Sequence, residues 1–141
     1  MFCHFGIGPN LKPKKGILQL QKLFETSTFW AKGRSVNEIK TMINNSSSII
    51  TVWHKEKLIG FGRATSDKVF RAVLWDIVVE KKFQKLGIGK FLVKLLLESK
   101  SVKNVKKVYL MTTHFEVFYK NCGFSTISKQ KCLLISDNIT S

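Results

Sequence analysis

The sequence has few acidic residues and few arginines, and each shortage bears on the kind of partner that the protein binds. Only 9 of its 141 residues are Asp or Glu against 24 Lys and Arg, which gives a formal net charge of +15. A balance this basic indicates an anionic partner: nucleic acid, a membrane surface or a phosphorylated cofactor. Just three of the cations are arginines, Arg34, Arg63 and Arg71. Because base readout and bidentate phosphate contacts favour arginine, the shortage counts against a dedicated DNA reader.

Cysteines and long apolar runs are scarce as well. The three cysteines, Cys3, Cys122 and Cys132, are an odd number without C-x-x-C spacing, so we expect neither a disulfide scaffold nor a bound metal. No apolar run approaches the 18 residues of a membrane span, and we expect no membrane partner. A signal or transit peptide is not visible in residues 1–16. The length fits one domain, and a hydrophobic fraction of 44% excludes intrinsic disorder.

Apolar spacing and turn residues predict the secondary structure. A capping box at Ser35-Val36-Asn37-Glu38 marks the start of one helix. The predicted helices are 17–25, the one beginning at Ser35, one following Gly89, and a short one at 114–121. The predicted strands are 49–54, 58–65, 69–79 and 108–113, with one or two more at 125–135.

This order of elements predicts an α+β domain on a mixed sheet, since hairpins come early and a strand–helix–strand crossover comes late. We expect one domain over residues 17–141, preceded by an N-terminal extension (1–16) that could be mobile. Gly60 and Gly62, inside a predicted strand, indicate a bulge or a close approach of another backbone.

A glycine loop joins one predicted strand to the next helix. It reads Gln84-Lys85-Leu86-Gly87-Ile88-Gly89-Lys90 and follows a stretch, 74–79, that is apolar except for Asp76. Backbone N–H groups and a helix N-terminus at such a loop form a cradle for phosphate. The loop lacks the Gly-Lys-Ser/Thr of a P-loop and the third glycine of the dinucleotide fingerprint. The pattern therefore predicts an anion site of another kind.

Two segments resemble the signatures of the GNAT superfamily of N-acyltransferases. Gln84-x-x-Gly87-x-Gly89 resembles its Q/R-x-x-G-x-G/A loop, and Phe-Tyr-Lys-Asn-Cys-Gly-Phe at 118–124 resembles its FY-x-x-x-GF helix. The pair is far more specific than either segment alone, and the resemblance covers residues 17–136. Stretches at 58–67, 71–76 and 109–114 resemble the cyanobacterial and plastid group that includes plant arylalkylamine (serotonin) N-acetyltransferases. The chain is identified as a plastid-type member.

The resemblance implies the GNAT acyl-CoA N-acyltransferase fold, an α+β domain whose mixed central sheet is splayed at the cofactor site and flanked by helices. It implies acetyl-CoA as co-substrate, with the pyrophosphate on the loop amides and the pantetheine arm along a strand edge, where backbone N–H would polarise the thioester carbonyl. Thr112 stands where many relatives have Asn or Asp. The residues so implied are Ile77, Val78, Val79, Gln84, Lys85, Leu86, Gly87, Ile88, Gly89, Lys90 and Thr112.

The implied reaction is direct attack of a neutral amine on the thioester, which needs a general acid and a general base. Tyr119 matches the tyrosine that usually serves as the acid, and a packing role is the alternative. Asp76 is a carboxylate inside an apolar strand, which predicts a raised pKa or a buried partner. It is a candidate base or a structural hydrogen-bond acceptor. His114 is the other candidate base, with a helix cap or an exposed histidine as its alternative, and proton removal through water also stays open.

We therefore expect an N-acetyltransferase whose acceptor is a primary amine: an arylalkylamine, a protein lysine or a protein N-terminus. Trp30, Trp53 and Trp75 could line a pocket for an aromatic amine, although tryptophans are more often core. The alternative is a non-catalytic basic protein on the same fold that binds nucleic acid or the ribosome. Its support is the charge, whereas the intact loop, Tyr119 and Asp76 favour the enzyme.

Composition also bears on location. Lys, Asn, Ile and Phe are abundant and only three residues are Ala, a bias typical of AT-rich genomes. With the resemblance, this predicts a plastid (chloroplast) protein encoded in the plastid, with a bacterial cytoplasm as the alternative. The oligomeric state stays open, a homodimer included. Residues 80–107 carry nine Lys and two Glu, a net +7, so a phosphorylated cofactor at the glycine loop explains part of the charge.

Overall fold

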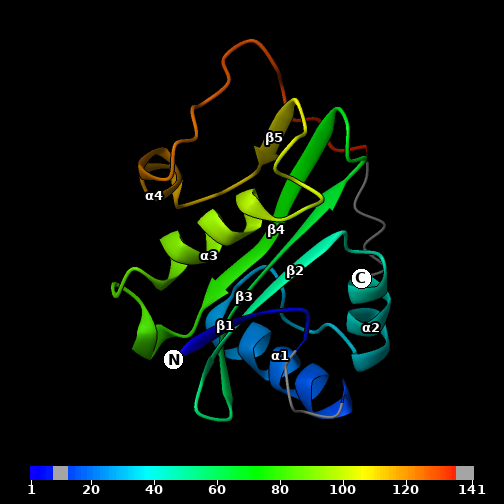
Figure 1. Cartoon of the computed structure of the whole chain (residues 1–141), viewed down its shortest axis with the longest axis vertical. Coiled ribbons are helices and arrows are strands. Elements are labelled where there is room, and N and C mark those ends of the chain that lie inside the picture. Colours follow the sequence, from blue (N-terminus) through cyan, green and yellow to red (C-terminus); the bar gives the residue numbers. More distant parts are fainter. Residues whose placement is uncertain (8–12, 136–141) are drawn as a thin grey trace. The chain divides into compact units, whose positions relative to one another are not determined.

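The computed structural model describes residues 1–7 and 13–135 of the chain. They form two compact units, Met1–Met111 and a smaller one that begins at Thr112, and each is described here by itself (Figure 1). No helix within the described ranges has the length and apolar character that crossing a membrane requires.

The first unit holds all the strands that the described residues form, together with three α-helices. In chain order its elements are β1 (Phe2–Phe5), α1 (Pro13–Ser27), α2 (Val36–Asn44), β2 (Ser48–His54), β3 (Lys57–Ser66), β4 (Arg71–Val79), the 3-10 turn η1 (Lys81–Phe83), α3 (Ile88–Glu98) and β5 (Lys107–Leu110). The second unit holds α4 (Glu116–Asn121).

The five strands form one mixed sheet in the order β1-β2-β3-β4-β5. The first three pairings are antiparallel, and β5 lies parallel to β4. Helix α3 is the crossover between these two parallel strands, as a parallel connection requires. The predicted α+β class and mixed sheet are therefore confirmed, and so are the predicted strands over β2, β3 and β4.

The two faces of the sheet are covered by different helices, and β3 shows why. Phe61 meets Phe24 of α1 edge to face, with 5.6 Å between ring centroids, inside a cluster that includes Leu20 and Trp53. Because side chains alternate along a strand, Gly62 faces the other way. A Cβ atom there would overlap Leu92 and Leu96 of α3. The glycine thus leaves room for the side chains of α3. The bulge predicted as its other role is present at Gly62 as well.

Helix α2 begins as its sequence predicts. The Ser35 side chain accepts the Glu38 amide at 3.1 Å, and the Glu38 carboxylate accepts the Ser35 amide at 2.8 Å. This reciprocal capping box satisfies two amides that a helix start leaves without partners.

Two predictions about the ends of the chain differ from the structure. Within the expected N-terminal extension, Phe2–Phe5 form edge strand β1, which pairs with β2 from Phe2↔Trp53 to Phe5↔Ile50. Four residues are too short to show an alternating pattern, and the pairing comes from β2. Conversely, residues 125–135 form no strand, although one or two were expected. The described part of the second unit offers them no strand to pair with, and β-propensity acts only through such neighbours.

Candidate functional site

The parallel pairing of β5 with β4 stops partway along β4. Its register runs from Arg71↔Lys107 to Leu74↔Leu110, whereas β4 continues to Val79. From Trp75 onward β4 is paired with β3, and no strand of the described chain covers its other edge. Unpaired strand edges present backbone N–H and C=O groups that an extended ligand can bind. The sheet is thus open at the stretch from which the sequence predicted cofactor contacts.

A β-bulge lies at the start of this open edge. Arg63 pairs with Trp75 and Phe61 with Val78, so Asp76 and Ile77 together stand opposite the single residue Gly62. Asp76 has a φ of 53°, the left-handed region in which Asp is tolerated better than most residues. A bulge bends its strand and increases the local twist. It therefore marks the point at which β4 continues without β5.

The Asp76 carboxylate is the centre of a buried charged network. Arg34 Nη2 lies 3.0 Å from Asp76 Oδ1, and Arg63 Nε lies 2.8 Å from Oδ2. Trp30 Nε1 also donates to Oδ1, at 3.1 Å. The Asp76 side chain is only 5% exposed. Of the two expectations for Asp76, a raised pKa or a buried partner, the structure gives partners.

The arginines decide the pKa of Asp76. Burial alone would raise it, because it disfavours the charged form. Hydrogen bonds and charge from Arg34 and Arg63 outweigh burial, and the pKa of Asp76 lies below its ordinary value. A carboxylate that stays ionised with both oxygens bound is a weak proton acceptor, so the geometry favours a positioning role for Asp76.

The glycine loop follows β4 directly. After η1, the Gln84 side chain turns back and donates to the Val79 carbonyl at 2.9 Å, which ties the loop to the strand end. Lys85 and Gly87 have φ values of 65° and 83°, and Gly87 is the N-cap of α3. A Cβ at Gly87 would have no atom within 4 Å. Gly87 therefore allows the left-handed backbone conformation of this turn, and the space beside it is open.

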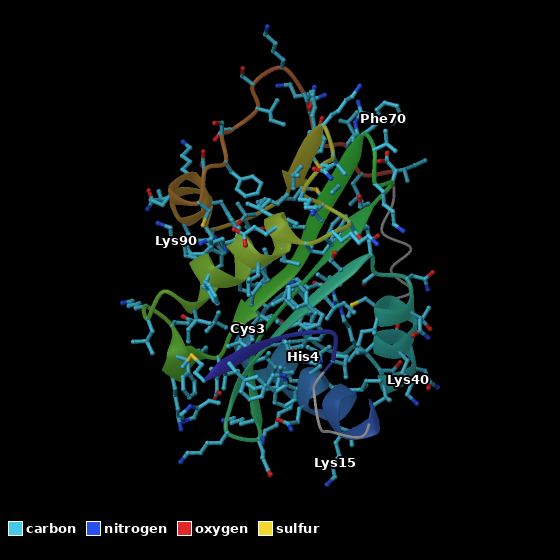
Figure 2. All side chains as sticks on the ribbon, in the orientation of Figure 1. Cys3, His4, Lys15, Lys40, Phe70 and Lys90 are labelled. Atoms are coloured by element: carbon cyan, nitrogen blue, oxygen red, sulfur yellow. The ribbon has the colours of Figure 1, made fainter. Side chains whose placement is uncertain are left out.

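Helix α3 begins in this loop with amides that have no acceptor inside the helix. The first intrahelical bond runs from the Phe91 amide to the Gly87 carbonyl at 3.1 Å, so the amides of Ile88, Gly89 and Lys90 precede it. Lys85, Leu86 and Lys90 are exposed around them, and Figure 2 shows Lys90 on α3. Amides, the helix dipole and lysine charge at one place can bind a phosphate.

The remaining three predicted site residues belong to the second unit. Thr112 Oγ1 accepts the Phe115 amide at 3.1 Å just before α4, and His114 is exposed in the same turn. Tyr119 lies on α4, with its ring 4.9 Å from that of Phe118 and 6.1 Å from that of Phe124. Burial, and secondarily Cys122, raise the pKa of Tyr119 to about 12. Its phenol therefore stays protonated throughout the neutral range.

The structure thus places Asp76 to Val79 and Gln84 to Lys90 on consecutive elements of one unit, and Thr112, His114 and Tyr119 on the other. Sequence reasoning missed Arg34, Arg63 and Trp30 as the partners of Asp76. A lone carboxylate in an apolar strand does imply a cation, but the sequence offers 24 of them. Of the three tryptophans, Trp53 is buried, and Trp75 donates to Thr65 Oγ1 at 2.8 Å. Trp30 is 40% exposed.

Comparison with known proteins assigns this arrangement to a family. Residues 17–124 match the model of the acetyltransferase (GNAT) family. The chain belongs to the GNAT family. The resemblance seen in the glycine loop and in the 118–124 segment is confirmed at this level, and so is the GNAT fold.

Sequence relatives of this GNAT chain come from algae, cyanobacteria and plants. It is 36% identical over 113 residues to an uncharacterized N-acetyltransferase, ycf52, of Pyropia yezoensis, covering 77% of this chain and 64% of the relative. It is 32% identical over 104 residues to a chloroplastic GCN5-related N-acetyltransferase of Arabidopsis thaliana, covering 70% and 53%. The chain spans 60% to 64% of the length of the ycf52 relatives it matches.

Solved GNAT structures share the fold at low sequence identity. An acetyltransferase of the GNAT family from Streptococcus pneumoniae superposes with a TM-score of 0.76 at 18% identity, covering 97% of this chain and 99% of that one. A GNAT-family acetyltransferase from Xanthomonas campestris gives 0.74 at 20% identity, with 91% and 87% covered. At these identities the likeness is one of fold alone.

Proposed function

We propose that the chain is an acetyl-CoA-dependent N-acetyltransferase that transfers an acetyl group directly to a primary amine. The observation that carries the proposal is the edge of β4 from Trp75 to Val79, with which no strand of the described residues pairs on the β5 side and which leads straight into the glycine loop. A strand edge that ends in a phosphate cradle suits a ligand with an amide-containing arm and a pyrophosphate.

The residues present fit acetyl-CoA. The proposed pyrophosphate donors are the backbone amides of the loop from Lys85 to Lys90, with Lys85 and Lys90 adding positive charge and Gly87 leaving space for close approach. The proposed partners of the pantetheine arm are the backbone groups of Ile77, Val78 and Val79. When bound, acetyl-CoA supplies an activated acetyl thioester, whose carbonyl an N–H of this strand edge would polarise.

Proton transfers are assigned to residues of the second unit. We propose that Tyr119 protonates the departing thiolate. With a pKa of about 12, its phenol carries the proton that this step needs throughout the neutral range. His114 is the proposed base, acting directly or through water. Asp76 is proposed to position Arg34, Arg63 and the bulge rather than to accept the proton, because both of its oxygens are already bound.

An aromatic amine is the proposed acceptor. Phe29 and Trp30 form an exposed edge-to-face pair, with 5.1 Å between ring centroids, in the segment between α1 and α2. The Trp30 indole N–H is fixed on Asp76, so the pair is held beside the bulge of β4. Exposed, fixed aromatic rings suit stacking on an aromatic acceptor. This supports the arylalkylamine group that the sequence resembles over a protein lysine or N-terminus.

Acetyl-CoA binding tests the site. Millimolar acetyl-CoA should raise the melting temperature of the wild-type chain by mass action. Gly87→Asp should abolish that shift, because it places a side chain and a negative charge at the cradle. The matched control is Gly33→Asp, which also has a positive φ (80°) and open space around its Cβ and should retain the shift. No shift in the wild type would overturn the acetyltransferase proposal.

A panel of acceptors tests the substrate class. With acetyl-CoA, turnover should be higher on tryptamine or serotonin than on peptide lysine or peptide N-termini. Trp30→Leu should raise KM for the aromatic amine at least about fivefold through lost stacking, with acetyl-CoA affinity unchanged. Equal or higher turnover on the peptides would exclude the aromatic assignment while leaving the acetyltransferase intact.

We propose a plastid as the site of action. The Arabidopsis relative is a chloroplastic N-acetyltransferase, and the composition bias of the sequence favours the same location. Immunolocalisation or fractionation of plastids tests this, with a bacterial cytoplasm as the contrary result if the source cell is a prokaryote.

A further inference from the structure

The end of the sheet away from the glycine loop carries a concentrated positive charge. It consists of the β3–β4 turn (66–71) and the α3–β5 loop (99–107), which together we call the basic end. Six exposed cations lie on it: Lys68, Arg71, Lys100, Lys103, Lys106 and Lys107. None of them takes part in an ion pair among the described residues. The same two segments contain a single acid, Asp67.

Two apolar side chains are exposed within the basic end. Val69 and Phe70 are adjacent in the β3–β4 turn and are 52% and 51% exposed. Lys106 Nζ lies 5.2 Å from the centroid of the Phe70 ring. Figure 2 shows Phe70 at the end of the sheet where β4 begins. Val69 and Phe70, which we call the apolar tip, are thus exposed to water among these cations, although exposing apolar surface to water is unfavourable.

Hydrogen bonds hold the basic end in one shape. The Asp67 carboxylate accepts the amides of Val69 and Phe70 at 2.8 and 2.6 Å. The amides of Lys106 and Lys107 donate to the carbonyls of Val69 and Phe70 at 3.2 and 3.0 Å. A surface fixed in this way loses little conformational freedom on binding, so contact with a partner is less opposed by entropy.

The proposed acetyl-CoA site does not account for this charge. The β3–β4 turn of the basic end lies at the start of β4, and the α3–β5 loop is hydrogen-bonded to that turn, whereas the glycine loop follows the end of β4. The nine-residue strand therefore separates the turn from the glycine loop by about 26 Å at roughly 3.3 Å per residue. That is more than two Debye lengths at physiological salt. The six cations of the basic end therefore need another explanation.

The side-chain types distinguish two anionic partners. Five of the six cations are lysines, whereas nucleic-acid recognition favours arginine. Val69 is aliphatic and cannot stack on a base, but both Val69 and Phe70 can enter the interface of a lipid bilayer while lysines contact anionic headgroups. We propose that the basic end docks this protein on the surface of an anionic lipid bilayer, with Val69 and Phe70 inserted. The sequence led us to expect no membrane partner because it has no long apolar run. That absence argues against a membrane-spanning segment, but it does not bear on binding at the surface of a bilayer.

Vesicle co-sedimentation tests the proposal on the intact chain without acetyl-CoA. The protein should pellet with vesicles of phosphatidylcholine containing phosphatidylglycerol and not with phosphatidylcholine alone, and added salt should weaken the binding. Lys68→Glu should weaken it on the order of thirtyfold, since each unit charge near such a surface is worth a factor of about five. Lys55→Glu is the matched control: Lys55 is also exposed in a hairpin turn with a positive φ. It should change binding less than about threefold.

The apolar tip has its own test. Val69→Ser combined with Phe70→Ser should reduce binding at least about tenfold, whereas Phe5→Ser, which alters an exposed phenylalanine on β1, should not. Thermal melts verify that each variant is folded. If the double variant is unfolded, the comparison of Lys68→Glu with Lys55→Glu tests the proposal instead. Equal effects of Lys68→Glu and Lys55→Glu, equal binding to neutral and anionic vesicles, or binding of single-stranded RNA without vesicle binding would each overturn the proposal.

Discussion

Two of the three arginines in the chain bind one carboxylate. Arg34 also lies over the Phe24 ring at 5.0 Å, and Arg63 over the Trp75 ring at 5.8 Å. A buried charge without a partner is strongly destabilising, whereas a complete pair is close to neutral. The arrangement therefore contributes less to net stability than to fixing three segments on one another: the α1–α2 connection, β3 and the bulge of β4.

Replacing Asp76 should expose this dependence. Asp76→Asn keeps the shape and tolerates a positive φ, but it leaves Arg34 and Arg63 without a counter-charge. At pH 7 it should lower the free energy of unfolding, measured with urea, by about 3 kcal/mol. Asp67→Asn is the control. The pKa of Asp67 is lowered chiefly by hydrogen bonds from backbone amides, with a smaller contribution from the Arg71 charge. The side-chain oxygen of Asn can still accept those hydrogen bonds, so Asp67→Asn should lower the free energy of unfolding much less than Asp76→Asn does.

The pH dependence follows from the direction of the Asp76 shift. Because the folded-state pKa is lowered, the stabilisation is present above the unfolded value, about 3.9, and is lost as pH falls through the folded value. The difference between wild type and Asp76→Asn should therefore be constant from pH 5 to 8 and shrink below about pH 4. A difference that grows on acidification would contradict the ion-pair account.

Tyr119 can be tested as an acid because the chain has one other tyrosine. Tyr119→Phe should lower kcat about a hundredfold through loss of the transferred proton, with acetyl-CoA affinity within about twofold. Tyr109→Phe, on β5, should leave kcat unchanged. With the pKa of Tyr119 at about 12, its ionisation should produce no fall in kcat below about pH 11. Unchanged turnover in Tyr119→Phe would remove the residue from the mechanism.

At the scale of elements, one missing side chain sets how closely α3 lies on the sheet. Gly62→Ala should lower the free energy of unfolding by about 1 to 3 kcal/mol, because the new methyl group overlaps Leu92 and Leu96. Shortening Leu92 to Ala creates space at the same point. The double variant should therefore be more stable than the sum of the two single changes predicts, by at least about 1 kcal/mol. Strict additivity in urea unfolding would show that α3 does not close on Gly62.

Elements with a complete local signal were predictable from the sequence. Helix α2 has its capping box, and β2, β3 and β4 have apolar, β-branched residues bounded by turns. The prediction failed where strand formation depends on pairing with another strand. Segment β1 is a strand because it pairs with β2, whereas residues 125–135 have the composition of strands but no strand to pair with. Gly62 was predictable in part. Its position inside a predicted strand indicated a bulge or a close approach, but the sequence did not indicate that α3 is the element that packs there.

At the scale of the whole molecule, the sequence predicted the loop that could bind phosphate but not the network behind it. Gln84, Gly87 and Gly89 are contiguous, so their spacing is visible in one segment. Arg34, Arg63 and Asp76 come from three segments. The predicted hairpin of β3 and β4 brings Arg63 near Asp76, but nothing in the chain order places Arg34 beside them. The overall charge was likewise visible as a number, whereas its division between the two ends of the sheet appears only in three dimensions.

The Asp76 network has a consequence for how this chain can vary. Loss of Asp76 alone leaves two arginines without a counter-charge, whereas loss of either arginine leaves the carboxylate paired with the other. Related sequences that lose the carboxylate should therefore lose the arginines too, while the loss of Arg34 or Arg63 alone should be accepted more readily. Sequence variation at the bulge of β4 should in this sense be limited first by its carboxylate.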